Sequence, residues 1–157
     1  MSPVARKPCK GNPVGSGKKR RTVCRECPFA RATEPGETGG TGPTTYVAQA
    51  HGPFLLSCHM DPDYEKDRRS TKLLQCAGAA IYRANTKRAE LMPPALLALK
   101  PDTELVFGGP AELLAHHGEV PKFVAEQFLR EHPVDELLAD EVRRSGVQVV
   151  AMERKKP

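Results

Sequence analysis

The chain has 157 residues, of which 39% are apolar and 27% charged, and this length predicts one domain with a modest core. Trp is absent, and 15 Pro and 13 Gly argue against a long regular helical bundle. The sequence has neither an apolar signal-peptide core nor an apolar run long enough to cross a bilayer. We therefore expect a soluble, cytoplasmic protein that does not contact membranes.

Positive charge is concentrated at the N-terminus. Residues 1–31 contain nine of the 24 Lys and Arg side chains and one acid, Glu26, so this part carries +8, whereas residues 32–157 carry −3. Residues 1–22 combine Pro, Gly and Ser with almost no apolar side chains, which predicts a disordered basic arm. The arm ends in four residues that we expect to contact nucleic-acid phosphates: Lys18, Lys19, Arg20 and Arg21.

Beyond the arm, hydrophobic periodicity and Pro or Gly punctuation predict short helices and a few strands. Helices are expected at 44–50, 71–91, 94–99, 111–117, 121–131 and 134–144. Strands are expected at 53–58, 103–109 and 147–152. These elements predict a small, helix-rich α+β domain with a short sheet, organised around a Cys-ligated metal centre. We expect a Cys-rich metal-binding core over 23–118 and a helical extension with a basic tail over 119–157.

Four of the five cysteines fall within one 53-residue stretch. Cys24 and Cys27 form a Cys-x-x-Cys knuckle, in which two intervening residues let both sulfurs reach one ion. Cys58 and Cys76 supply a second pair, and Cys76 lies near the start of a predicted helix, where backbone amides favour a thiolate. Cytosolic thiols are kept reduced, so this clustering favours metal ligands over disulfides. Cys9 lies in the arm and is expected to be unliganded.

Zinc accepts four Cys at these spacings, or three Cys and one His. An iron–sulfur cluster is the alternative, although the tight spacing of bacterial cluster motifs is absent. His59 follows Cys58 directly, and neighbouring strand residues point to opposite faces. His59 is therefore expected either to replace one Cys as a metal ligand or to contact a metal ligand without binding the metal itself. The sequence thus predicts zinc, with iron–sulfur left open.

The segments CRECPFAR, FLLSCH and QCAGAAIYRAN resemble a family of small, uncharacterised Cys-rich proteins of actinobacteria and their phages. That family has Cys-x-x-Cys-Pro, Cys-His and Cys-Ala-Gly motifs and is described as a domain of unknown function. The resemblance covers about residues 22–118. It supports the ligand assignment and implies no activity.

These features favour a non-enzymatic, metal-stabilised module that contacts DNA, RNA or a nucleic-acid-associated protein complex. One alternative is a phage or host accessory factor for protein–protein interaction, with the amphipathic segment 120–144 as the partner face. The other is an iron–sulfur redox sensor or an enzyme, for which Glu26, Asp61 and Asp63 are the available bases. Four cysteines would leave no open position on a metal, so we expect no catalytic residue.

Overall fold

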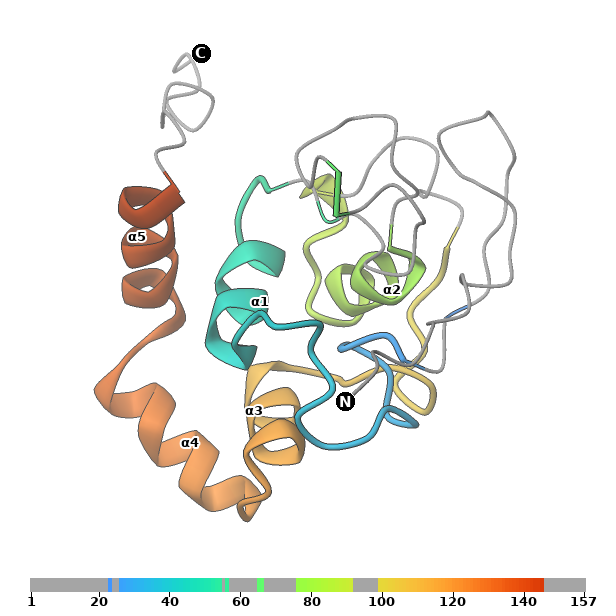
Figure 1. Ribbon diagram of the computed structural model, residues 1–157. Coiled ribbons are helices and arrows are strands. Elements are labelled where there is room, and N and C mark those ends of the chain that lie inside the picture. Colours follow the sequence, from blue (N-terminus) through green and yellow to red (C-terminus); the bar gives the residue numbers. More distant parts are fainter. Residues whose placement is uncertain are drawn as a thin grey trace.

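The computed structural model describes residues 23, 26–54, 56, 65–66, 76–91 and 99–145. Within these ranges the chain forms helices joined by turns, and Figure 1 shows α1 between α5 on one side and α2 on the other. The elements are α1 (Pro43–Ala50), α2 (Ala77–Asn85), the 3-10 helix η2 (Ala89–Leu91), α3 (Pro110–Gly118), α4 (Lys122–Glu131) and α5 (Val134–Ser145). No described helix has the length and apolar character needed to span a membrane.

The predicted α+β fold is wrong for the described residues, which contain helices and no strand. Extended backbone pairs there only in an isolated antiparallel bridge between Ala30 and Val106. The prediction that the fold is organised around a metal centre is also wrong for these ranges. Their core is apolar and aromatic, and no three potential metal-ligating side chains converge within them.

The segment predicted as a strand at 103–109 is a series of turns around one bridge, because side chains take up part of its backbone hydrogen bonds and residues 29–31 pair with it only at Leu105 and Phe107. The Asp102 carboxylate accepts the N–H groups of Glu104 and Leu105 at 3.1 and 3.0 Å. The Asn85 amide nitrogen lies 3.1 to 3.3 Å from the carbonyl oxygens of Asp102, Val106 and Phe107, to which it donates. A side chain from α2 thus fixes this segment in place of a neighbouring strand.

The predicted strand at 53–58 is likewise absent where it is described. Pro53, Phe54 and Leu56 are not in a strand, and the Leu56 carbonyl accepts the N–H of Cys76 at 2.9 Å. The strand predicted at 147–152, the helix predicted at 94–99 except Leu99, and residues 71–75 of the helix predicted from 71 lie outside the described residues. In the described part of that last helix, only Ala77–Asn85 is α-helical and forms α2; the prediction that it continues to residue 91 is wrong, because Lys87 takes a positive φ of 61° and Ala89–Leu91 form the separate 3-10 helix η2.

The three C-terminal helices lie close to where the sequence predicts them, because their ends are set locally. Glu119, with φ 52°, stops α3 in the left-handed conformation. Pro121 and Pro133 each stand directly before the next helix. In α5 the acids Asp135 and Glu136 occupy the first turn, where they oppose the positive end of the helix dipole.

Apolar and aromatic side chains from several elements form the core. Phe29 lies with its ring centroid 5.6 Å from Tyr46 of α1 and 5.2 Å from Tyr82 of α2. Val47 and Leu113 are fully buried beside them. The core therefore joins the loop that contains Cys27 to helices α1, α2 and α3.

A buried arginine holds the C-terminal end of α1. Arg83 of α2 is only 2% exposed, and its guanidinium donates to five backbone carbonyls at 2.8 to 3.1 Å. The acceptors are Gln49, Ala50, Gly52, Phe54 and Leu91. The last carbonyls of a helix have no partner within the helix, so Arg83 supplies the missing donors. Burial lowers the pKa of Arg83 to about 10, which leaves the side chain charged at neutral pH.

Helix α5 packs on α1 through both apolar and polar contacts. Leu138 lies so close to Gly52 that a Cβ there would come within 2.4 Å of its Cδ1 atom. Glu141, although 5% exposed, accepts hydrogen bonds from Gln49 of α1 and Arg144 of its own helix. The inner face of α5 is therefore already occupied by α1.

Candidate metal centre

Cys76 stands at the N-terminus of α2, as the sequence predicts. Its backbone is extended, and its Sγ accepts the N–H of Ala79 at 3.4 Å, so the thiol is the N-cap of the helix. The positive charge of Arg83 acts on the same sulfur, since Cys76 raises the pKa of Arg83 against the effect of burial. The Cys76 sulfur therefore lies at the positive end of the α2 dipole and within electrostatic range of a buried cation.

Cys27 brings the second sulfur from a segment 49 residues away. Its Sγ lies 3.4 Å from the Sγ of Cys76, and its side chain is buried at 2% exposure. Two sulfurs on one tetrahedral zinc ion, with bonds of about 2.3 Å, lie about 3.8 Å apart. The observed distance is within half an ångström of that value and far longer than the ~2.05 Å of a disulfide. The two thiols are therefore in hydrogen-bonding contact and are not joined by a disulfide.

Two histidines of α3 fasten the loop that follows Cys27. The His117 Nδ1 accepts the N–H of Gly36 at 3.1 Å, so its Nε2 carries the proton and donates to the Pro28 carbonyl at 2.7 Å. Burial lowers the pKa of His117, which favours this neutral form. The His116 Nε2 contacts the Thr33 carbonyl. These histidines hold the cysteine loop rather than ligate a metal.

The backbone of Cys27 is fixed independently of its sulfur. The Cys27 carbonyl accepts the N–H of Ala30 at 2.9 Å and the hydroxyl of Thr33 at 2.6 Å. Thr33 is 2% exposed, so this contact is shielded from water. Cys27 thus enters the pair from a rigid turn, which lowers the entropy lost when an ion binds.

Gly78 makes room for the sulfur pair. A Cβ built at Gly78 would lie 2.2 Å from the Cys27 Sγ and 3.5 Å from the Cβ atoms of Cys27 and Phe29. Glycine in a helix interior ordinarily costs about 0.5–1 kcal/mol relative to alanine. Glycine is nevertheless required at this position, because only a hydrogen atom fits between the helix backbone and the Cys27 Sγ.

Replacing Gly78 with Ala should therefore destabilise the protein by about 1–3 kcal/mol, the usual range for overpacking. The matched control is Gly118→Ala, also in a helix, where the nearest atom to a new Cβ is 3.7 Å away. Denaturant unfolding of both variants measures the difference. A Gly78→Ala protein as stable as the control would contradict the close approach of sulfur and helix.

The structure places only two of the predicted ligands. Cys24, Cys58 and His59 lie outside the described residues, as do Cys9 and the four basic residues of the arm. Within the described ranges no third His, Cys, Asp or Glu completes a metal-binding group with Cys27 and Cys76. Glu26, considered above as a base, has one buried carboxylate oxygen without a hydrogen-bond partner among the described residues.

Sequence reasoning missed the polar residues that hold this region together. Arg83 and Asn85 lie in the largely apolar run AGAAIYRAN. A charged residue among small apolar side chains was the signal in the sequence that could have indicated a buried, hydrogen-bonded arginine. His51, which directly follows α1, has its Nε2 2.7 Å from the Tyr82 hydroxyl. Burial, with Arg88 and Arg83 nearby, lowers the pKa of His51 to about 4, so it is neutral at physiological pH.

Comparisons with protein families, with curated proteins and with solved structures find no match to this chain. The ligand assignment therefore depends on the geometry of the sulfur pair and on the sequence.

Proposed function

We propose that this chain is a zinc-stabilised binding module in which Cys24, Cys27, Cys58 and Cys76 hold one ion. The observation that supports the proposal is the 3.4 Å distance between the sulfurs of Cys27 and Cys76. Two cysteines so far apart in sequence meet in a partly buried site at a helix N-terminus, and the buried Arg83 interacts electrostatically with one of them. A shared ion accounts for that convergence better than two inert thiols.

Chain connectivity brings the other two cysteines within reach of the pair. Cys24 precedes Cys27 by three residues, and its neighbour Val23 packs against the core. Cys58 follows Leu56 by two residues, and the Leu56 carbonyl accepts the N–H of Cys76. Two residues span at most about 7 Å. The short separations in sequence from Cys24 to Cys27 and from Cys58 to Leu56 support including both thiols in the proposed site.

The sulfur spacing favours zinc over a cubane cluster. The cysteines of a [4Fe–4S] cluster bind different irons, which holds their sulfurs farther apart than two ligands of a single ion. A thiolate pair 3.4 Å apart suits one tetrahedral ion. Four thiolates would also close the coordination sphere, so the proposed role of the metal is structural rather than catalytic.

The proposed partner is nucleic acid, bound through the basic arm. Residues 1–31 carry +8, and the run Lys18–Arg21 ends three residues before Cys24. Phosphate contacts made by the run would therefore be anchored to the metal-stabilised body. The rest of the chain is net acidic, so the arm must supply the affinity.

Metal analysis of the purified, reduced protein tests the first half of the proposal. We expect one zinc per chain and no visible absorption, and cobalt exchanged for zinc should give the intense colour of tetrahedral thiolate coordination. A brown protein that contains iron and sulfide would contradict zinc. A metal-free protein with the same fold would remove the metal from the proposal altogether.

The salt dependence of binding to DNA or RNA tests whether the basic arm contacts nucleic acid. Replacing Lys18, Lys19, Arg20 and Arg21 with Gln should weaken binding to DNA or RNA and flatten its salt dependence. Each lost phosphate contact lowers the log–log slope by about 0.7 to 0.9. The matched control is replacement of Lys155 and Lys156 in the basic tail, which should change the slope less. An unchanged slope in the four-residue variant would place the contact elsewhere, and a native protein that does not bind at low salt would eliminate this role.

A further inference from the structure

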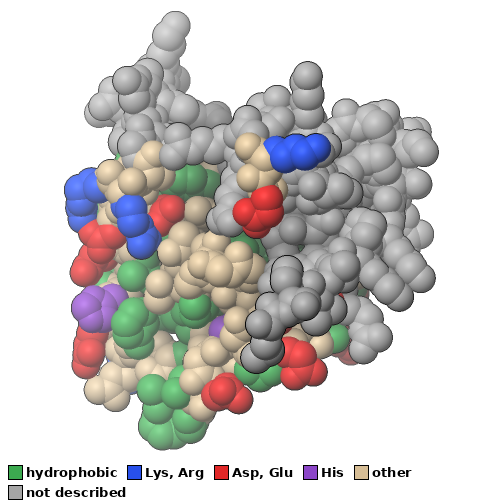
Figure 2. Space-filling view, in the orientation of Figure 1, with side chains coloured by type: hydrophobic (Ala, Val, Ile, Leu, Met, Phe, Trp, Pro, Cys, Tyr) green, Lys and Arg blue, Asp and Glu red, His purple; other side chains and the backbone are tan. Residues whose placement is uncertain are grey.

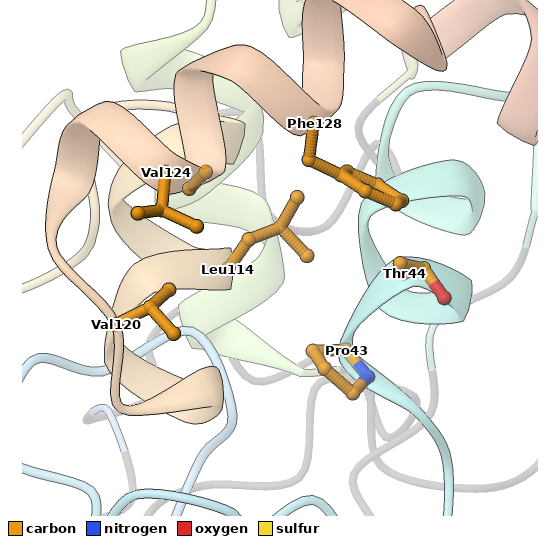
Figure 3. A pocket seen from close by; sticks show the side chains of 7 residues that line it. Pro43, Thr44, Leu114, Val120, Val124 and Phe128 are labelled. Atoms are coloured by element: carbon orange, nitrogen blue, oxygen red, sulfur yellow. The ribbon is translucent and has the colours of Figure 1, made fainter.

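Two thiols touch in the described chain, at Cys27 and Cys76. Their Sγ atoms are 3.4 Å apart, although 49 residues separate the two cysteines. On the face that Figure 2 shows, basic and acidic side chains are interspersed, and the groove of about 240 Å³ in Figure 3 is lined by Thr44 and by apolar side chains. Neither the charges nor the apolar groove specifies a ligand, whereas two thiols in contact specify a reaction, the formation of a disulfide.

The first turn of α2 holds both sulfurs. The backbone N–H of Ala79 donates to the Cys76 Sγ at 3.4 Å, which turns this side chain back over the helix. The Cys27 Sγ reaches the same turn because Gly78 has only a hydrogen atom there, and a Cβ would lie 2.2 Å from the sulfur. A disulfide of ~2.05 Å requires the sulfurs to approach by about 1.4 Å. Changes in side-chain torsion angles can supply a movement of that size.

The two thiols differ in their exposure to water. Cys27 is buried, at 2% exposure, whereas Cys76 is partly exposed. Oxidation of cysteine by small oxidants follows the access that the oxidant has to the sulfur. A peroxide should therefore react with Cys76 first, and Cys27, already in contact with that sulfur, is placed to react with the product.

We propose that Cys76 is a peroxide-sensitive thiol and that Cys27 converts its oxidised form into a disulfide. In the first step the Cys76 sulfur attacks one oxygen of hydrogen peroxide, the O–O bond breaks, and a sulfenic acid and one water form. In the second step the Cys27 sulfur attacks the Cys76 sulfur. The S–O bond breaks, and the hydroxyl group leaves with the Cys27 thiol proton as a second water. The two thiols lose two electrons, which the peroxide gains.

The disulfide gives the protein a second, oxidised state. In a compartment that keeps thiols reduced, the disulfides that do form are usually transient and redox-sensing, and a dithiol reductant restores the thiols by supplying two electrons and two protons. Where four cysteines hold an ion, the cross-link removes two of its ligands, so oxidation should release the metal and lower the stability of the chain. This consequence alone rests on the proposed function, because the cross-link itself requires only the two sulfurs.

Peptide mapping of the full chain tests the cross-link. Trypsin cleaves after Lys and Arg and places each of the five cysteines in a different peptide, with Cys27 in residues 26–31 and Cys76 in residues 73–83. After treatment with one equivalent of hydrogen peroxide and alkylation of the remaining thiols, mass spectrometry should find these two peptides joined by the main disulfide. A dithiol reductant should separate them, and Cys9→Ser should give the same result as the native chain.

The unfolded chain is the matched control for the geometry. Without the fold, loop closure favours cysteines that are close in sequence, so peroxide added in denaturant should mainly join Cys24 to Cys27. The disulfide between Cys27 and Cys76 should then be at least about tenfold less abundant than in the folded chain. Equal abundance in both would show that the fold does not direct the reaction.

Dimedone, which captures sulfenic acids, tests the order of the two steps. Added together with peroxide, it should label the 73–83 peptide and leave the 26–31 peptide unlabelled. Label on the 26–31 peptide, a main disulfide between other cysteines, or complete alkylation of both peptides would each overturn the proposal. The zinc content of the same samples should fall as the cross-link forms. A chain that forms the cross-link but never contained zinc would support this proposal and contradict only the metal.

Discussion

Replacing Arg83 with Met is expected to lower the free energy of unfolding by at least about 5 kcal/mol. The guanidinium donates to four backbone carbonyls at the end of α1 and in the turn after it, and to the carbonyl of Leu91 at the end of η2. Of these acceptors, Gln49 also accepts the N–H of Gly52. Each buried acceptor left without a donor costs about 1–3 kcal/mol. Domains of this size are stable by only about 5–15 kcal/mol, so most of the variant should be unfolded in denaturant titrations at room temperature.

Two variants make the test specific to those hydrogen bonds. Arg83→Lys keeps the charge but offers three donors on one atom, so it should cost less than Met and still destabilise clearly. Arg88→Met is the matched control, since the half-buried Arg88 donates through Nη1 to the single carbonyl of Thr86, and it should cost at most about 1 kcal/mol. Equal stability of the Arg83 and Arg88 variants would contradict the role of Arg83.

Replacing Cys76 with Ser is expected to abolish zinc binding and to destabilise the protein by several kcal/mol, because site formation and folding are coupled. Ser is a strong N-cap, so α2 keeps the hydrogen bond that the Cys76 sulfur now accepts from Ala79. The loss of stability can therefore be assigned to the metal rather than to the helix cap. Zinc content and denaturant unfolding, measured on the same preparation, give both quantities.

Cys27→Ser should match Cys76→Ser, and Cys9→Ser should match the native chain. If Cys27 and Cys76 were only packed thiols, the Ser variants would keep their fold and the native chain would bind no metal. If they formed a reversible disulfide, the native protein would gain stability on oxidation and not on addition of zinc. Full metal content in both Ser variants would refute the ligand assignment.

Some of the fold could be predicted because the responsible interactions are local. The helices α3, α4 and α5 begin at or directly after Pro, α3 ends at Gly118 and α4 ends before His132–Pro133. These residues act through their own backbone dihedrals. Residue types at short spacing were sufficient for these predictions, whatever the remainder of the chain does.

The wrong predictions involve residues that are far apart in sequence. The apolar run at 103–109 has strand-like composition, but Asn85, about twenty residues earlier, takes its carbonyls. No partner strand is needed, so none forms in the described residues. Apolar composition predicts burial there, which Val106 and Phe107 confirm, but it does not specify the hydrogen-bond partner.

By itself the sequence determined the positions of α1, α3, α4 and α5 to within one or two residues, and it identified the cysteines that are candidates for a single site. It did not determine the ends of α2, which is much shorter than the predicted helix. Only the tertiary structure decided that the Cys76 sulfur caps α2, that Cys27 meets Cys76 across 49 residues, and that Arg83 closes α1. The physical reason is that caps and turns depend on neighbours along the chain. Contacts between distant segments depend on which surfaces the whole chain buries together.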